Sequence, residues 1–517
     1  MKKLFLAVLA GLMVMAMASV ASAEVTVGGE LEVRYDVWSN LQLNSSAGRV
    51  TNVFAAHGSQ VTETQSFWAQ RVTLNVDAKI TEGLEAFVEL DTTGTEIPWG
   101  GQTGFALNNN NGGLSQDLSH QDGTLDIKQA WINFMVPGLP VGVKVGHQPL
   151  ALGHGIWLDT HRQGSDAVLL YAKPIPELLL AGVYISGNNG SNTFPGVGGG
   201  LALDSAAFGN GHNDTNIYAV LANYTFMENN TVGVNFSYVS DNNMGGVATA
   251  HPGLTLGSGN DLFATNTMVT LDGSMGPLSY RGEFDWLFVH TARVNGGVEP
   301  AEVTAYAALL GADYQVTPMF KAGLEMAFGT GNDNDDASAF YNPSTSAGAG
   351  TTKNSGGTFQ TMDHAYSVGP YGATSYNYAF LYNDKIGQGP LGTGGGLGFG
   401  DGFGGFGLAN TGYVKLALKA NPMDKLSVGL DAMYLHASAQ AVAGQSRDLG
   451  WEVDMNASYK IYDNLTLDLR GGVFVPGAWY EYPNTVAGNG ALFENAVAGK
   501  LKTDTAWGME TKLAVKF

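Results

Sequence analysis

Apolar and polar residues alternate strictly along many segments of this chain. In residues 25–37 one set of alternate positions is apolar and the other carries charge. A period of two places successive side chains on opposite faces of a β-strand. Several charges on one face would be unstable in a dry core, but they suit a strand between lipid and a water-filled lumen. The charged residues of this strand are Glu30, Glu32, Arg34 and Asp36.

The same alternation recurs in residues 278–288 and 451–461 and in the closing segment 509–517. Acidic and basic residues both occur on the predicted inner face, as expected for a wide aqueous pore. A channel dedicated to exporting a polyanion should instead be lined mainly by Arg and Lys. The predicted pore-lining residues are Glu30, Glu32, Arg34, Asp36, Arg71, Arg281, Glu283, Asp285, Glu452, Asp454 and Arg470.

Short turns alternate with long connections along the chain. Eight short turns rich in Gly, Pro, Asn and Asp each join the two strands of a predicted pair. They lie at 81–83, 137–140, 173–177, 227–230, 273–277, 316–318, 421–424 and 462–464. Nine long segments separate successive pairs, at 38–65, 92–122, 150–165, 186–214, 241–263, 290–302, 330–410, 438–449 and 476–503. This pattern predicts an all-β fold, a transmembrane antiparallel barrel of about eighteen strands with short periplasmic turns and long extracellular loops.

Two segments leave the strand count open, with sixteen strands as the alternative. The strand at 168–172 is short against the roughly 9–11 residues that a spanning strand needs. The segment 124–136 changes phase near Gln129, which indicates a β-bulge. A soluble β-sandwich or solenoid would leave rows of Val, Leu, Phe and Tyr facing water.

Residues 1–23 have the pattern of a Sec-type export signal. A basic start at Lys2 and Lys3 precedes an apolar run over 4–17, and small residues at 21–23 precede Glu24. The apolar run is too short for a permanent bilayer span. We therefore predict a signal peptide at 1–23 and a single barrel domain at 24–517, whose net charge would be −23 in place of −21.

Composition supports a barrel and excludes several functions. The chain has 72 Gly, 10% aromatic residues and only 14% charged residues, about half the usual charged share. It has no Cys, which excludes disulfides, thiolate metal sites and a cysteine nucleophile. The acidic balance makes nucleic acid an unfavourable partner, because phosphates would be repelled.

Few residues suggest metal or cofactor chemistry. His147, His154 and His161 are evenly spaced, but a single loop would have to turn all three inward to bind one metal ion. Asp333, Asp335 and Asp336 resemble part of a calcium loop that lacks its closing Glu, so they are a weak calcium candidate. The glycines of 392–407 do not lie between a strand and a helix, and no nucleophile with a base emerges. We predict no cofactor, no other metal site and no enzymatic activity.

Residues 146–168, GHQPLALGHGIWLDTHRQGSDAV, together with the preceding 126–131, resemble porins of the alginate-export-like type. The resemblance implies a Gly-rich external loop that bends into the lumen, with Arg162 and Asp166 at the constriction. The terminal Phe517 resembles the carboxy-terminal signal of Gram-negative outer-membrane proteins, which the barrel-insertion machinery reads.

The predicted function is that of an outer-membrane porin, a water-filled channel for passive diffusion of small hydrophilic solutes or ions. Its expected partners are outer-membrane lipid and lipopolysaccharide and the insertion machinery, and assembly into a homo-oligomer is left open. The alternatives are a substrate-specific channel or polysaccharide exporter, and a non-channel anchor or adhesin.

Overall fold

The structure, a computed structural model, describes 24–40, 43, 64–92, 97–98, 126–161, 164–189, 214–241, 262–291, 302–331, 376–383, 386, 407–408, 410–439, 446–481 and 503–517. The predicted signal peptide therefore lies outside the described residues. No helix in the described ranges is long and apolar enough to cross a membrane.

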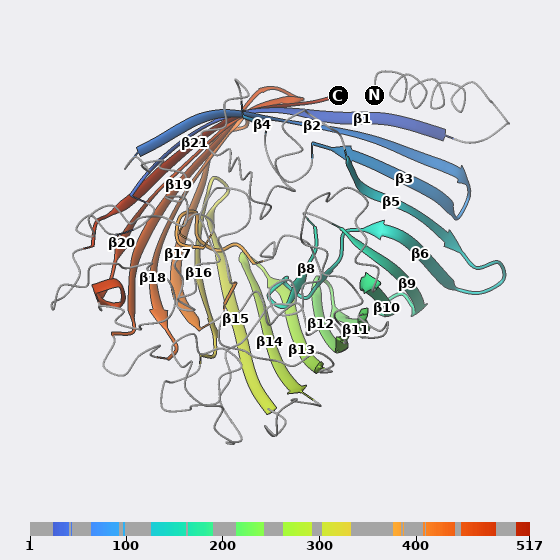
Figure 1. Cartoon of the computed structure of the whole chain (residues 1–517). Helices are drawn as coiled ribbons and strands as arrows, with labels where there is room; N and C mark the ends of the chain where they lie inside the picture. The colour runs from blue at the N-terminus through green and yellow to red at the C-terminus, as the bar shows by residue number, and fades with distance from the viewer. Residues whose placement is uncertain are drawn as a thin grey trace, which may run out of the picture.

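Eighteen long strands of the described residues form one closed antiparallel barrel (Figure 1). In chain order they are β1 Glu24–Ser39, β2 Thr64–Thr81, β3 Leu84–Asp91, β5 Asp126–Met135, β6 Val141–Gln148, β9 Ser165–Ile175, β10 Leu178–Asn189, β11 Asp214–Met227, β12 Asn230–Asp241, β13 Leu262–Met275, β14 Leu278–Thr291, β15 Glu302–Thr317, β16 Phe320–Gly329, β17 Thr411–Met423, β18 Leu426–Ala437, β19 Asp448–Tyr462, β20 Leu465–Pro476 and β21 Ala506–Lys516. The shorter elements are β4 Ile97–Pro98, β7 Ala151–Leu152, β8 Leu158–Asp159 and the 3₁₀ turn η3 Ala478–Glu481.

The barrel closes between its first and last strands. β1 pairs with β2 on one side and with β21 on the other, in a register running from Glu30 opposite Lys516 to Ser39 opposite Trp507. At the end of this seam Gly29 and Phe517 exchange two backbone hydrogen bonds of 3.0 and 3.1 Å. Closure leaves no free sheet edge, as a barrel in lipid requires.

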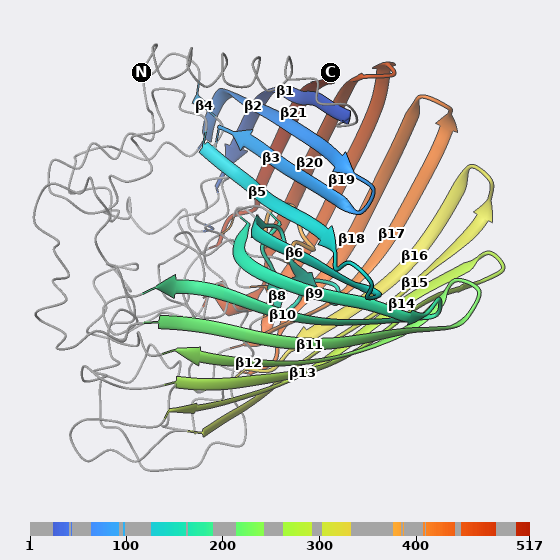
Figure 2. The same cartoon turned by 90° about the vertical axis from the view of Figure 1, so that its right-hand side faces the viewer.

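The eight predicted turns are confirmed, and all lie at the same end of the barrel (Figure 2). The short segment that left the count open is part of β9, which has 11 residues and is long enough to span. The predicted phase change is a bulge. Glu89 pairs with Gln129 and Leu90 with Ile127, so Lys128 has no opposite residue. Eighteen strands are thus confirmed over sixteen.

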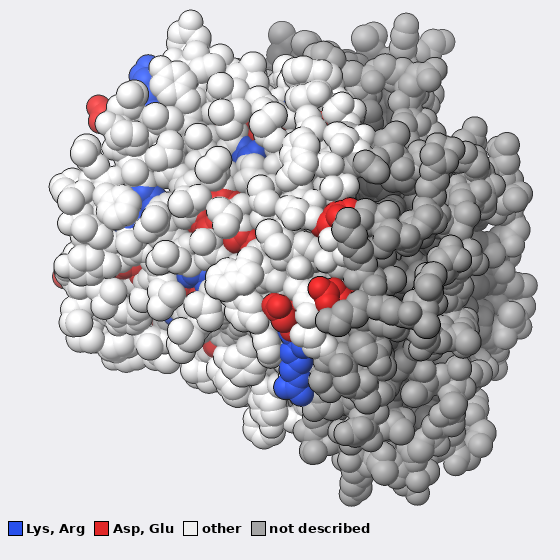
Figure 3. Space-filling view, turned by 90° about the vertical axis from the view of Figure 1, so that its left-hand side faces the viewer, with Lys and Arg blue, Asp and Glu red and all other residues white. Residues whose placement is uncertain are grey.

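The outer face of the barrel is apolar. Exposed side chains such as Phe284, Trp286, Trp451 and Met455 alternate along their strands with inward-facing polar residues. One side of the molecule accordingly shows few charged side chains over its described part (Figure 3). A band of exposed Val, Leu, Phe and Trp is far larger than a water-soluble surface tolerates, and it matches contact with lipid.

Candidate channel lumen

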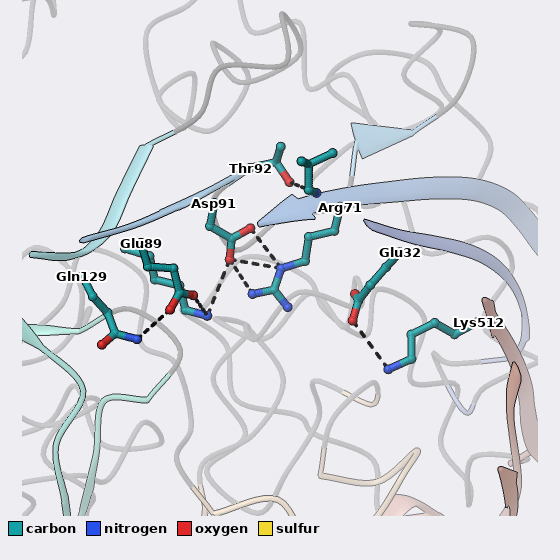
Figure 4. A network of polar contacts seen from close by, with 9 residues as sticks. Glu32, Arg71, Glu89, Asp91, Thr92, Gln129 and Lys512 are labelled. Carbon is teal, nitrogen blue, oxygen red and sulfur yellow. Dashed lines mark hydrogen bonds and ion pairs between the residues drawn. The ribbon is translucent and has the colours of Figure 1, made fainter. Parts of the chain in front are cut away.

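The inner wall formed by β1, β2, β3 and β5 carries a connected group of ion pairs (Figure 4). The Arg71 guanidinium binds the Asp91 carboxylate, with Nε to Oδ1 at 3.0 Å. The Lys128 ammonium lies 3.0 Å from Glu89 and 3.6 Å from Asp91. Gln129 donates to Glu89 at 2.9 Å. The bulge at Lys128 changes the direction of β5 locally, so that the Lys128 ammonium reaches two carboxylates of the neighbouring strand β3.

The wall continues across the seam with the same mixed charge. The Arg34 Nε lies 2.7 Å from Asp36 Oδ2, and its Nη1 lies 3.6 Å from Glu510. Lys512 approaches Glu32 at 3.7 Å. The pairs of Arg34 with Glu510 and of Lys512 with Glu32 join β1 to β21, two strands that are adjacent only because the barrel closes.

Further along the wall, Glu325 of β16 has partners on the adjacent strand β17 and on β14, which lies beyond β15. Arg281 of β14 makes an ion pair with it, and Lys415 of β17 lies at 2.8 Å. The Tyr413 hydroxyl donates to the same carboxylate at 2.7 Å. Acidic and basic side chains thus lie side by side on this part of the inner face as well.

A first segment of the chain folds inward after β6. We call residues 150–161 the first inner segment. Ile156, Trp157 and Leu158 are fully or almost fully buried. The His154 backbone N–H donates to the carboxylate of Glu283 on β14. Because β14 is not a neighbour of β6 or β9 in the sheet, the segment must reach across the inside of the barrel.

Gly153 allows this close approach. It has φ of +57°, and a Cβ there would meet the Glu283 carboxylate and the Met268 sulfur. A cavity of about 210 Å³ remains between the segment and the wall, lined by residues that include Leu152, Asn223, Thr270 and Asp272.

A second segment folds inward from the long connection between β16 and β17. We call residues 376–383 the second inner segment. The backbone N–H of Leu381 donates to Glu452 Oε1 at 2.6 Å and that of Tyr382 to Oε2 at 2.8 Å. The Phe380 N–H donates to Asp454 Oδ2 at 3.1 Å. Two carboxylates of β19 thus hold three consecutive peptide groups.

Apolar contacts complete this docking. The rings of Phe380 and Trp38 lie 5.4 Å apart, and the Arg470 guanidinium lies 5.0 Å from the Phe380 ring centre. A Cβ at Gly472 or Gly508 would meet Leu381. Glycines on β20 and β21 therefore leave the space that the segment occupies.

The second inner segment was not predicted, because residues 330–410 were treated only as a long loop. A signal was present in the sequence. Tyr376, Tyr378 and the run Phe380 to Tyr382 form an aromatic cluster within a stretch rich in Gly, Ser and Asn. Burial raises the pKa of the Tyr378 hydroxyl well above its usual value, and likewise that of Tyr382, so both remain neutral.

The predicted pore-lining residues do not share one environment in the structure. Glu283, Asp285, Glu452 and Asp454 are buried, and the two inner segments bond to three of them. This differs from the expectation of water contact, because the alternation of a strand gives the face of a side chain but not what covers it. The predicted residues that keep partial or full exposure are Glu30, Glu32, Arg71, Arg281 and Arg470.

The remaining predicted sites have separate locations. Asp166 is exposed at the start of β9, where its carboxylate lies 2.8 Å from His147 Nδ1. Phe517 is 65% exposed at the seam, with its ring against Gly29. Three other predicted features lie outside the described residues, namely Arg162, the weak calcium candidate Asp333, Asp335 and Asp336, and the signal peptide.

The three histidines do not converge on one point. His147 contacts Asp166, His154 approaches Asp272 at 3.4 Å, and His161 lies 2.6 Å from Asp159. Over the part of the chain that the structure describes, no group of three or more His, Asp and Glu side chains is arranged to hold a metal ion.

Together, the closed barrel, the apolar outer face and the charged inner face define a membrane-spanning β-barrel. No protein-family model and no curated protein matches the chain. The chain is similar to several solved structures at low identity. They include Pseudomonas aeruginosa OccK9 (OpdG), at 12% identity and a TM-score of 0.48 over 96% of this chain and 99% of that chain. Pseudomonas aeruginosa OccK11 (OpdR) is 10% identical, with a TM-score of 0.46 over 95% of this chain and 96% of that chain. The resemblance to alginate-export-like porins remains a prediction.

Proposed function

We propose that this chain is an outer-membrane porin, which forms a water-filled channel for passive diffusion of small hydrophilic solutes or ions. The observation that carries the proposal is the mixed-sign charged inner face of a closed barrel whose outside is apolar. An anchor or adhesin would need no such interior. Enzymatic activity is not proposed. We further propose Sec-type export and contact with lipid, lipopolysaccharide and the insertion machinery.

The two inner segments support a channel whose lumen is narrowed rather than one that is open along its whole length. They pack on different parts of the wall, one on β14 and the other on β19. We propose that the first inner segment and the residues that follow it set the constriction, with Arg162 and Asp166 near its narrow point.

A substrate-specific channel is the second candidate, because ordered groups from two segments and the wall meet in one lumen. A polysaccharide exporter is less favoured, because acidic groups such as Glu32 and Glu89 share the wall with the basic ones.

Conductance in a planar lipid bilayer tests the proposal. Purified folded protein should give stepwise current increases, whereas the same protein after heat denaturation should give none. Absence of steps from folded protein would contradict a channel and favour an anchor. Reversal potentials in a salt gradient should show a weak preference for small cations, because the mature chain is acidic. A clear anion preference would refute that selectivity while leaving the channel intact.

A further inference from the structure

Two inner-face carboxylate pairs of this barrel have the same arrangement but different surroundings. Each is a Glu and an Asp two residues apart on one strand, Glu283 with Asp285 on β14 and Glu452 with Asp454 on β19. In each pair the two side chains are in direct contact, and an inner segment covers them. The two pairs differ in the groups that balance their negative charge.

The pair on β19 has several partners, and only Asp454 Oδ1 of its four oxygens lacks one among the buried atoms of the described residues. Its carboxylates accept the three peptide N–H groups of the second inner segment, and Arg470 lies close enough to Asp454 to attract it. Glu452 and Asp454 therefore have both hydrogen-bond donors and a nearby positive charge.

The pair on β14 has much less. Glu283 accepts one N–H from His154, and Asp285 accepts the Asn266 side-chain N–H at 2.7 Å. No Lys or Arg of the described residues makes an ion pair with either carboxylate. Asp285 and Asn266 are 0% exposed, so water in the open lumen does not reach them.

Three oxygens of this cluster lack any partner. They are Glu283 Oε1, Asp285 Oδ2 and Asn266 Oδ1, all in residues that are at least nine-tenths buried. The Asn266 amide is held beside the pair by its bond to Asp285, which leaves its carbonyl oxygen free in the same cluster. A buried carboxylate without a compensating positive charge is strongly unfavourable.

We propose that Glu283, Asp285 and Asn266 form a binding site for one calcium-type cation under the first inner segment. Two carboxylates and an amide carbonyl are oxygen ligands of the kind that Ca²⁺ takes. Mg²⁺ is disfavoured, because it demands near-octahedral geometry and dehydrates reluctantly. The ion would neutralise the pair and thereby fix the first inner segment through Glu283.

The test measures bound metal in the full-length folded protein. Protein freed of metal with a chelator is dialysed against CaCl₂, and its calcium content is compared with that of Asp285→Asn. We expect the variant to bind one Ca²⁺ fewer per chain. Calcium should also raise the thermal unfolding temperature of the wild type and leave that of the variant unchanged. Parallel dialysis against MgCl₂ and NaCl checks the choice of ion.

Two further variants make the result specific. Combined replacement of Asp333, Asp335 and Asp336 by Asn removes the other acidic candidate and should leave the calcium effect on unfolding intact. If Asp285→Asn does not fold, Glu283→Gln serves instead, because its amide oxygen can still accept the His154 N–H. Equal calcium content in wild type and both site variants would overturn the proposal. The negative charge of the pair would then be balanced by a shared proton or by the cationic group of another side chain. This outcome does not depend on whether the barrel conducts.

Discussion

Glu452 should control whether the second inner segment stays docked in the lumen. Its two carboxylate oxygens accept the N–H groups of Leu381 and Tyr382, and the side chain is 0% exposed. Glu452→Gln keeps the size of the side chain but leaves one carbonyl oxygen to serve two donors. A buried donor left without a partner costs about 1–3 kcal/mol, so the docked state should lose stability by roughly 5- to 150-fold.

Thiol labelling can measure this shift directly, because the chain contains no Cys. A cysteine placed at Ala379, which is buried in the second inner segment, reports each opening to a membrane-impermeant maleimide. When reclosing is fast, the labelling rate follows the population of the open state. We expect the rate to rise roughly 5- to 150-fold when Glu452→Gln is added to Ala379→Cys.

Asp313→Asn is the matched control. It removes one carboxylate charge from the inner wall, where Asp313 pairs with Lys321 at 2.8 Å, and touches neither inner segment in the described structure. Its labelling rate should equal that of Ala379→Cys alone. An unchanged rate in Glu452→Gln would show that the apolar contacts of Phe380 hold the segment without the carboxylate, and the hydrogen-bond reasoning would be refuted.

Three other predictions concern the constriction, the seam and the tyrosines. Arg162→Ala should alter single-channel conductance and shift selectivity towards cations, and wild-type values of both would place the constriction elsewhere. Gly29→Val should weaken the seam by about 1–3 kcal/mol, because a branched side chain there meets the Phe517 ring. Both Gly29→Val and deletion of Phe517 should therefore lower the heat-modifiable folded fraction in outer membranes. Burial raises the pKa of Tyr378 and Tyr382, so the docking that depends on their neutral forms is fully present below their ordinary pKa of about 10 and declines above it. Conductance should therefore be steady through neutral pH and increase only in strong alkali, and an increase below pH of about 9 would contradict this assignment.

Much of the barrel could be predicted because its determinants are local. Alternation in a strand fixes which side chains share a face, and a Gly, Pro or Asn turn fixes where the chain reverses. Even the bulge at Lys128 was visible, because an extra residue breaks the period of two. The length of β9 was underestimated for a related reason. Its end at the short turn runs through Lys173, Pro174 and Ile175, which have turn-like composition but continue the strand.

The inner segments could not be predicted in the same way, since they depend on contacts between residues far apart in sequence. The alternation of β19 places Glu452 inside but does not distinguish lumen water from a peptide N–H of residues 381 and 382 as its partner. Glycine gives part of the missing information. Gly153, Gly472 and Gly508 lie where backbone or an apolar side chain of another segment comes too close for a Cβ. A glycine opposite a buried carboxylate on the inner face of a barrel therefore indicates a docked segment.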